Sequence, residues 1–340
     1  MLEGSHKTSD TNLQIVLASR PRGPASTANF QLRECPLPPL VDGQVLVRNH
    51  YLSLDPYMRG RMDDGPSYAA PHPVGEVMLG ATAGVVADSR HPGFAVGDSV
   101  LGSLGWQLFG VADGRSLRKI DTQRIPMSAY LGPVGMPGIT GWYGLHRIIR
   151  PKAGETLVVS AAAGAVGSVV GQLARALGCR VVGIAGGKAK CDHVVNELGF
   201  DACIDHRGGR LAADLEAATP AGVDGLFENV GGEPFDAALA RMNAHGRIAL
   251  CGLVAGYDGR PIPLHNVLAF IKARLRLEAF VISEHLDLWP HAVRELGDAV
   301  VRGEIKYRET VVQGLASAPA ALLGMLEGKN LGKQLVKLID

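Results

Sequence analysis

Two glycines that follow an apolar run are the residues whose types and spacing point most directly to chemistry. The run Thr156–Ser160 leads into Ala162, Gly164 and Gly167, a version of the pattern G-x-G-x-x-G with alanine at its first position. Apolar residues then recur at helical spacing over residues 166–177. A strand, a tight turn and a helix N-terminus present free N–H groups to a pyrophosphate. A turn made only of small residues is the alternative, but this context favours dinucleotide binding.

The next strand separates the two nicotinamide cofactors. An NAD site places Asp or Glu at the end of that strand, about 20 residues after the glycine pattern, where the carboxylate binds the ribose hydroxyls. Here the strand Arg180–Ala185 is followed by Gly-Gly-Lys-Ala-Lys at residues 186–190. No carboxylate occurs after the strand before Asp192. Ammonium groups instead neutralise a 2′-phosphate. The sequence therefore predicts NADP(H) rather than NAD(H).

Two further glycine-containing turns end later strands. Residues 227–232 read FENVGG, and residues 251–253 read CGL. Both are expected at the carboxyl ends of strands, where ligands bind in doubly wound sheets. Structural turns without a ligand are the alternative at each of them.

The predicted secondary structure that positions these turns changes near Pro133, from strands only to alternating strands and helices. Before it, short apolar runs separated by Gly and Pro are typical of an all-β barrel or sandwich; the predicted strands are residues 13–18, 29–34, 44–52, 77–87, 94–101 and 106–112. After it, alternating strands and helices predict a doubly wound parallel α/β sheet. Its predicted strands are residues 156–160, 180–185, 202–205, 222–228, 246–251 and 275–281. Its predicted helices are residues 165–177, 190–198, 211–217, 234–242, 264–272 and 288–302, and residues 333–338 form a strand of either domain.

Composition excludes several classes of protein. The chain has 340 residues, 46% of them hydrophobic, and a formal net charge of +1. Such a length suggests about two domains, and so small a charge argues against a nucleic-acid partner. The uncharged residues 156–174 are nearly long enough to span a bilayer, but three glycines interrupt them, so we expect no membrane span. Five scattered cysteines and a polar segment 1–10 without an apolar core predict a cytoplasmic protein without a secretory signal.

The sequence resembles the zinc-independent branch of the medium-chain dehydrogenase/reductase superfamily. Within it, the chain is similar to the alkenal/one reductases, which include prostaglandin and leukotriene reductases, plant 2-alkenal reductases and the NADPH-dependent curcumin reductase type. The resemblance rests on YLSLDPYMR at residues 51–59, GMPGIT at 135–140, the turn at 161–167, ENVGG at 228–232 and GKNLGK at 328–333. Residues 198–206 are most similar to the curcumin reductase type.

This resemblance implies a fold and a cofactor site. It implies a GroES-like β-barrel domain at residues 11–132, a Rossmann NADP-binding domain at 133–303 and a C-terminal segment, 304–340, that completes the first domain. It implies cofactor contacts at Gly164, Ala165, Val166, Gly167, Asn229, Cys251, Tyr257, Phe280, Ser283 and Asn330, with Lys190 on the 2′-phosphate. Plant relatives carry a tyrosine near the ribose phosphate at the position of His206, which would hydrogen-bond the phosphate here.

The residues of a zinc site are missing from the sequence. Zinc-dependent members of the superfamily carry Gly-His-Glu in the first domain and four closely spaced cysteines, whereas this chain has Val-Gly-Glu-Val at residues 74–77 and no such cysteines. We therefore expect no metal. Without a Lewis acid to polarise an alcohol or carbonyl, reduction of a conjugated C=C bond is favoured over alcohol dehydrogenation.

Reduction of an enone or enal needs a group that stabilises negative charge. Hydride addition at the β-carbon leaves an enolate, which requires a donor at the oxygen and a proton at the α-carbon. The resemblance assigns these catalytic roles to Tyr257 and Tyr57, with a ribose hydroxyl or water as another proton source. Tyr57 as a packing aromatic and Tyr257 as an exposed loop residue are the alternatives.

Two other functions share these sequence features. A quinone reductase of the zeta-crystallin type has the same fold and cofactor, although segments 55–59 and 228–232 fit the alkenal branch better. A non-catalytic NADPH-binding sensor would keep every cofactor position. The partner expected for an enzyme is a small-molecule enone or enal. The resemblance also implies a homodimer whose parallel sheets join edge to edge near residues 275–282.

Overall fold

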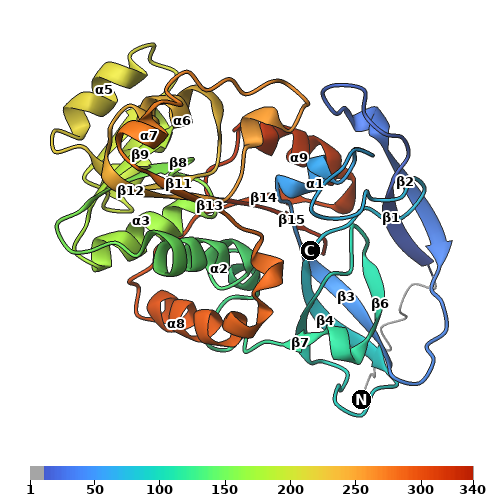
Figure 1. The fold of residues 1–340 in the computed structure, drawn as a ribbon. Coiled ribbons are helices and arrows are strands. Elements are labelled where there is room, and N and C mark those ends of the chain that lie inside the picture. The colour runs from blue at the N-terminus through green and yellow to red at the C-terminus, as the bar shows by residue number, and fades with distance from the viewer. Residues whose placement is uncertain (1–10, 340) are drawn as a thin grey trace. The chain divides into compact units, whose positions relative to one another are not determined.

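The computed structural model describes residues 11–339, so the polar segment 1–10 lies outside the described residues. The chain forms two compact units (Figure 1). The first comprises the chain up to Thr122, Val311–Leu323 and the end from Leu335; the second comprises Gln123–Thr310 and Gly324–Gln334. These units differ from the predicted domains, since residues 324–334 of the predicted C-terminal segment lie in the second unit. The domain boundaries at 132/133 and 303/304 therefore stay predictions.

The first unit is built on β-strands. β1 (Thr11–Leu17) and β2 (Phe30–Pro36) form an antiparallel pair. A seven-stranded sheet has the order β14-β15-β3-β4-β5-β7, with β6 pairing β3. Its strands are β3 (Gln44–Ser53), β4 (Thr82–Ser89), β5 (Ser99–Gly102), β6 (Phe109–Asp113), β7 (Arg118–Lys119), β14 (Glu309–Gln313) and β15 (Lys333–Lys337). β15 pairs antiparallel with β3, so that Leu335 lies opposite Ser53.

The second unit contains a six-stranded parallel sheet in the order β10-β9-β8-β11-β12-β13. Numbered within the sheet, this is the 3-2-1-4-5-6 order of the Rossmann fold. The strands are β8 (Thr156–Ser160), β9 (Arg180–Ala185), β10 (Ala202–Asp205), β11 (Val223–Glu228), β12 (Met242–Leu250) and β13 (Arg276–Ala279). The predicted combination of a β-domain and a doubly wound parallel sheet is confirmed.

The helices agree less closely with the sequence pattern. They are α1 (Tyr57–Gly60), α2 (Met136–Tyr143), α3 (Gly167–Ala176), α4 (Lys188–Asn196), α5 (Leu211–Ala218), α6 (Gly232–Leu239), α7 (Ala269–Lys272), α8 (Trp289–Val301) and α9 (Ala318–Leu326). The predicted helix 234–242 runs too far, because β12 already begins at Met242. The predicted helix 264–272 shortens to the single turn α7. No helix within residues 11–339 is both long and apolar enough to cross a membrane.

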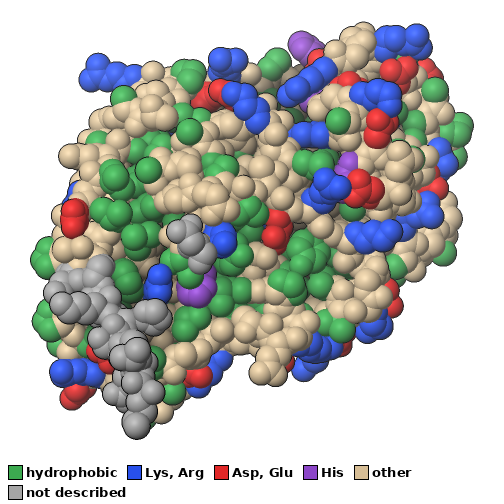
Figure 2. All heavy atoms as spheres, turned by 180° about the vertical axis from the view of Figure 1, so that it is seen from behind, with side chains coloured by type: hydrophobic (Ala, Val, Ile, Leu, Met, Phe, Trp, Pro, Cys, Tyr) green, Lys and Arg blue, Asp and Glu red, His purple; other side chains and the backbone are tan. Residues whose placement is uncertain are grey.

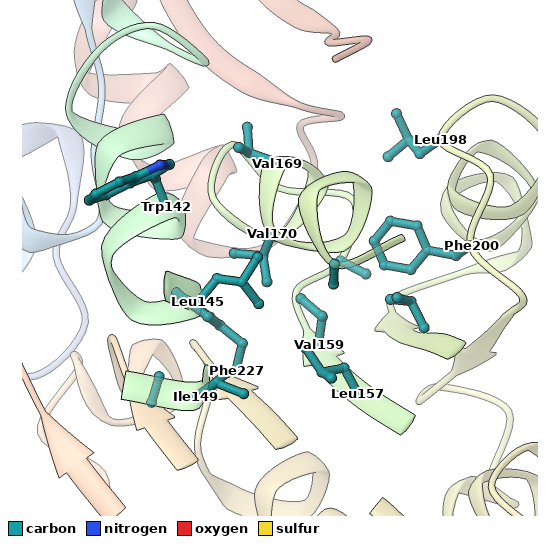
Figure 3. Close-up of a cluster of buried hydrophobic side chains, with 14 of the residues drawn as sticks. Trp142, Leu145, Ile149, Leu157, Val159, Val169, Val170, Leu198, Phe200 and Phe227 are labelled. Atoms are coloured by element: carbon teal, nitrogen blue, oxygen red, sulfur yellow. The ribbon is translucent and has the colours of Figure 1, made fainter. Parts of the chain in front are cut away.

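α2 has no counterpart in the sequence prediction, because Gly and Pro interrupt its apolar pattern. Its glycines permit close packing: a Cβ at Gly138 would lie 1.8 Å from the Pro133 carbonyl oxygen, and one at Gly141 would lie 3.0 Å from a Val170 methyl group. A π-helical segment, Gly144–Ile149, continues α2. Together they cover the sheet beside α3, as Figure 3 shows for Leu145, Val170 and Val159.

Candidate active site: a dinucleotide cradle and two tyrosines

The glycine turn joins β8 to α3, as predicted. All five residues of β8 are buried, and Ala161 then takes a left-handed backbone with φ of 48°. A Cβ at Gly167 would lie 2.5 Å from the Ala161 carbonyl oxygen, so the close approach of helix and turn requires glycine. Within residues 11–339, the N–H groups of Ala165 and Val166 have no acceptor. The turn therefore presents free donors at a helix N-terminus, as a pyrophosphate site requires.

A C-terminal segment of the second unit lies against this turn. The N–H of Gly332 donates to the Ala163 carbonyl oxygen at 2.8 Å, and Gly332 forms a bridge with Gly164. Two residues earlier, the side-chain amide of Asn330 donates to the Gly332 carbonyl oxygen at 2.8 Å. Asn330 is thereby brought to the glycine turn, which fits its predicted place in the cofactor site.

The two lysines after β9 have different surroundings. Lys188 is exposed and forms an ion pair with Asp192 at 2.6 Å. Lys190 is half-buried, and its Nζ donates to the Gly328 carbonyl oxygen at 2.8 Å. Burial lowers the pKa of Lys190, and the neighbouring charge of Arg207 lowers it further. Lys188 is thus neutralised by a carboxylate, whereas Lys190 is held by a backbone carbonyl group; its contact with the 2′-phosphate stays a prediction.

His206 and Arg207 follow β10 and lie beside the same turn. A Cβ at Gly186 would lie 2.9 Å from His206 Nε2 and 3.0 Å from Arg207 Nε. Burial, and then the charge of Arg207, lower the pKa of His206, so that neutral imidazole is favoured at pH 7. The charge of Lys190 also acts on His206, and the contact of His206 with the phosphate stays a prediction. A second cation beside Lys190 comes from Arg207, which the sequence analysis did not identify. The signal available was the basic residue directly after His206.

The carboxyl ends of β8 and β11 meet at the point where the sheet order reverses. The Asn229 N–H donates to Ser160 Oγ at 2.7 Å, and the Asn229 side chain donates to the Ser160 carbonyl oxygen at 2.8 Å. Glu228 is fully buried, and its Oε1 accepts from the N–H groups of Val230 and Gly231 at 2.6 and 2.7 Å. Burial raises the pKa of Glu228. Glu228 thus shapes the second glycine turn, and Asn229 lies at the usual ligand position of such a sheet.

Tyr257 reaches the same edge of the sheet from the loop after β12. A Cβ at Gly252 would lie 3.4 Å from the Tyr257 hydroxyl and 3.4 Å from the Asn229 carbonyl oxygen. The glycine therefore leaves room for the phenol beside the carboxyl end of β11. The preceding Cys251 has its pKa raised to about 12 by burial and by the charge of Glu228, which keeps the thiol protonated and unreactive.

Phe280 and Ser283 follow β13. The Phe280 ring lies 5.2 Å from the Tyr143 ring and 6.4 Å from the Phe227 ring between centroids, within an aromatic cluster. Its side chain is thus a packing element, and its backbone N–H donates to the Leu250 carbonyl oxygen at 3.4 Å. Ser283 is exposed in a 3₁₀ turn, Ile282–Glu284. Their cofactor contacts stay predictions.

Tyr57 belongs to the first unit, where it begins α1. Burial raises the pKa of its phenol, and the charge of Asp55 and the nearby Tyr68 raise it further. The hydroxyl consequently remains a donor at all physiological pH values. Ser53 Oγ donates to the Asp55 carboxylate in a buried contact, which fixes the segment before α1.

The fold and the glycine turn are those of a dinucleotide-binding oxidoreductase. Comparison with known proteins gives the same class. Residues 13–120 match the family described as the N-terminal domain of oxidoreductase, and residues 165–298 match the family described as zinc-binding dehydrogenase. The chain belongs to the medium-chain dehydrogenase/reductase family.

Several relatives are similar over nearly their whole length. The NADPH-dependent curcumin reductase of Escherichia coli (strain K12) is 46% identical, and the match covers 96% of this chain and 97% of the relative. The 2-alkenal reductase (NADP(+)-dependent) of Nicotiana tabacum is 38% identical, with 96% and 98% covered. The crystal structure of CurA in complex with NADPH from Vibrio vulnificus is 43% identical, covers 96% of this chain and 99% of that one, and has a TM-score of 0.92.

Proposed function

We propose that the protein is an NADPH-dependent reductase of the C=C bond of α,β-unsaturated ketones and aldehydes. The observation that carries this proposal is similarity across almost the whole chain to reductases named for curcumin, 2-alkenals and (+)-pulegone. The site geometry agrees with it, because the residues of a dinucleotide cradle converge in the second unit and a tyrosine hydroxyl lies beside them.

The residues of the cradle fit NADP(H). The free N–H groups of Ala165 and Val166 would hold the pyrophosphate, with Gly164 and Gly167 allowing its approach. Lys190, with His206 beside it, would hold the 2′-phosphate, since the β9 end offers Gly186 and Gly187 in place of a carboxylate. Asn229, Cys251, Tyr257, Phe280, Ser283 and Asn330 would line the remainder of the cofactor site.

Tyr257 and Tyr57 are the residues that would act on the substrate. When bound, NADPH supplies a hydride for the β-carbon. The Tyr257 hydroxyl donates a hydrogen bond to the carbonyl oxygen as it gains negative charge, which lowers the barrier. Tyr57 is assigned to orientation of the substrate, and its raised pKa keeps its proton in place. The proton at the α-carbon comes from a tyrosine, from water or from a ribose hydroxyl.

An acceptor panel tests the proposed function. NADPH oxidation is followed at 340 nm with a simple enone, with a para-quinone and without acceptor, and the products are identified. We expect a saturated ketone from the enone and little turnover of the quinone. Preferential reduction of the quinone would indicate a quinone reductase, and binding of NADPH without turnover of either acceptor would indicate a sensor.

We propose further that catalysis needs no zinc, in spite of the family description. The support is the absence of the Gly-His-Glu and four-cysteine patterns from the sequence. Exhaustive dialysis against 1,10-phenanthroline should leave kcat unchanged, and metal analysis should find no stoichiometric zinc. Loss of activity that added Zn²⁺ restores would contradict this expectation.

A homodimer joined at β13 is also proposed. β13 is an edge strand of the parallel sheet, and the exposed apolar residues Leu277 (37% exposed) and Ile271 (78%) lie on it and on α7. Exposed edges with apolar side chains favour pairing with a second chain. Light scattering should give twice the chain mass, and Leu277→Glu should give the monomer mass.

The matched control is Val96→Glu, because Val96 is an exposed apolar residue (68%) of the first unit, whereas β13 belongs to the second. This variant should keep the dimer mass. A monomeric wild type, or dissociation by both variants, would contradict pairing through β13.

A cytoplasmic location is proposed as well, since all five cysteines are free thiols, as is usual in a reducing compartment.

A further inference from the structure

Arg207 and Lys190 direct their charges to the same place in the second unit. Gly328 has a left-handed backbone with φ of 71°, and a Cβ placed on it would lie 3.5 Å from Arg207 Nη2 and 3.8 Å from Lys190 Nζ. Lys190 lies in α4, which follows β9, and Arg207 lies in the turn after β10; both cationic groups approach the turn that follows α9. Such an approach of like charges costs free energy unless something compensates for it.

Backbone carbonyls of the turn hold both cations. Lys190 Nζ donates to the Gly328 carbonyl oxygen at 2.8 Å, and Arg207 Nη2 donates to the Glu327 carbonyl oxygen at 3.4 Å. Among residues 11–339, neither cation forms an ion pair with a carboxylate. The Glu327 carboxylate instead pairs with Lys329 at 2.6 Å.

The nearest carboxylate on β10 is also occupied. Asp205 Oδ1 accepts from the N–H of Gly187 at 2.7 Å and from the N–H of Arg207 at 3.0 Å. These bonds hold the Arg207 backbone against the end of β9. The guanidinium itself donates to the turn rather than to Asp205, so Asp205 offsets its charge only at a distance and forms no ion pair with it.

We propose that Arg207 is a specificity-determining residue that binds the 2′-phosphate together with Lys190. This inference rests on the proposed function, which supplies NADPH as the ligand. A phosphate monoester beside Gly328 would accept from the guanidinium fork and the ammonium group together, and it would remove the repulsion between them. Arg207 is exposed, so its guanidinium is accessible to a ligand.

The same arrangement explains why glycine occupies two positions. A side chain at Gly186 would displace His206 and Arg207, whose atoms lie 2.9 and 3.0 Å from its Cβ position. A side chain at Gly328 would be strained by its φ and would intrude between the two cations. Both glycines keep open the space that a phosphate would fill.

Isothermal titration of the enzyme without cofactor tests the proposal, with 2′,5′-ADP and 5′-AMP as ligands at constant ionic strength. These ligands differ in the 2′-phosphate, and binding needs no catalysis. In Arg207→Gln the dissociation constant for 2′,5′-ADP should rise by about tenfold or more, because a charge-assisted contact is lost. The constant for 5′-AMP should stay unchanged, and Arg207→Lys should recover part of the affinity.

Lys188→Gln is the matched control, because it removes the same charge from the start of α4, where Lys188 is paired with Asp192. It should bind both ligands as the wild type does. If Arg207→Gln keeps the full preference for 2′,5′-ADP, or if Lys188→Gln loses as much affinity for it, the role of Arg207 is overturned. The proposed NADPH specificity is not affected by either result. A wild type without any preference for 2′,5′-ADP would overturn the proposed NADPH specificity as well.

Discussion

Replacing Lys190 with alanine is expected to raise the KM for NADPH by about tenfold to a hundredfold, the range of a lost hydrogen bond to a charged group. The KM for NADH should change little, because NADH has no phosphate at the ribose 2′ position. The half-buried Lys190 ammonium group is held at the Gly328 carbonyl oxygen, so its position is fixed before a ligand binds. Initial rates with each cofactor at a saturating enone concentration give both constants.

Lys188→Ala serves as the control for this experiment. Lys188 lies on α4 shortly before Lys190. Its side chain is 85% exposed and forms an ion pair with Asp192. Its removal should leave both KM values unchanged. An equal rise of the two values in Lys190→Ala would show that this lysine supports the fold of the turn rather than recognition of the phosphate.

The strands of the parallel sheet could be predicted closely from the sequence, and there is a physical reason. β8 is a short apolar run that ends at Ser160, β9 is followed directly by Gly186, and β10 ends at Asp205, so the local pattern defines their limits. α2 could not be predicted in the same way. Its Gly and Pro residues weaken helix propensity, and the helix is stabilised by tertiary contacts such as that of Gly141 with Val170.

The cations proposed to bind the phosphate show the same limit. Lys190 was assigned to the phosphate from the family resemblance and from the missing carboxylate after β9, and this role stays a prediction. Its partner, the Gly328 carbonyl oxygen, is 138 residues away, and only the folded second unit brings the two together. Arg207 was missed for this reason: nothing in the local sequence shows that the turn after α9 lies beside β10.

The last expected result concerns the chemical step. Tyr257→Phe should lower kcat for an enone by about tenfold to a hundredfold, while the dissociation constant for NADPH changes little. The Tyr257 hydroxyl lies at the carboxyl ends of β11 and β12, beside Gly252 and the Asn229 carbonyl oxygen. A donor to the substrate oxygen acts mainly in the transition state, where the oxygen carries negative charge, so its loss affects kcat more than binding.

Tyr57→Phe provides the comparison, since it removes the same atom from the other unit. It should chiefly raise the KM for the enone, because Tyr57 is assigned to orientation of the substrate. Initial rates over a range of enone concentrations give kcat and KM for each variant, and fluorescence titration gives the dissociation constant for NADPH. If the double Tyr→Phe variant keeps nearly full turnover, neither hydroxyl stabilises the enolate. In that case water or a ribose hydroxyl donates the proton, Tyr57 is a packing aromatic and Tyr257 is a loop residue without a catalytic role.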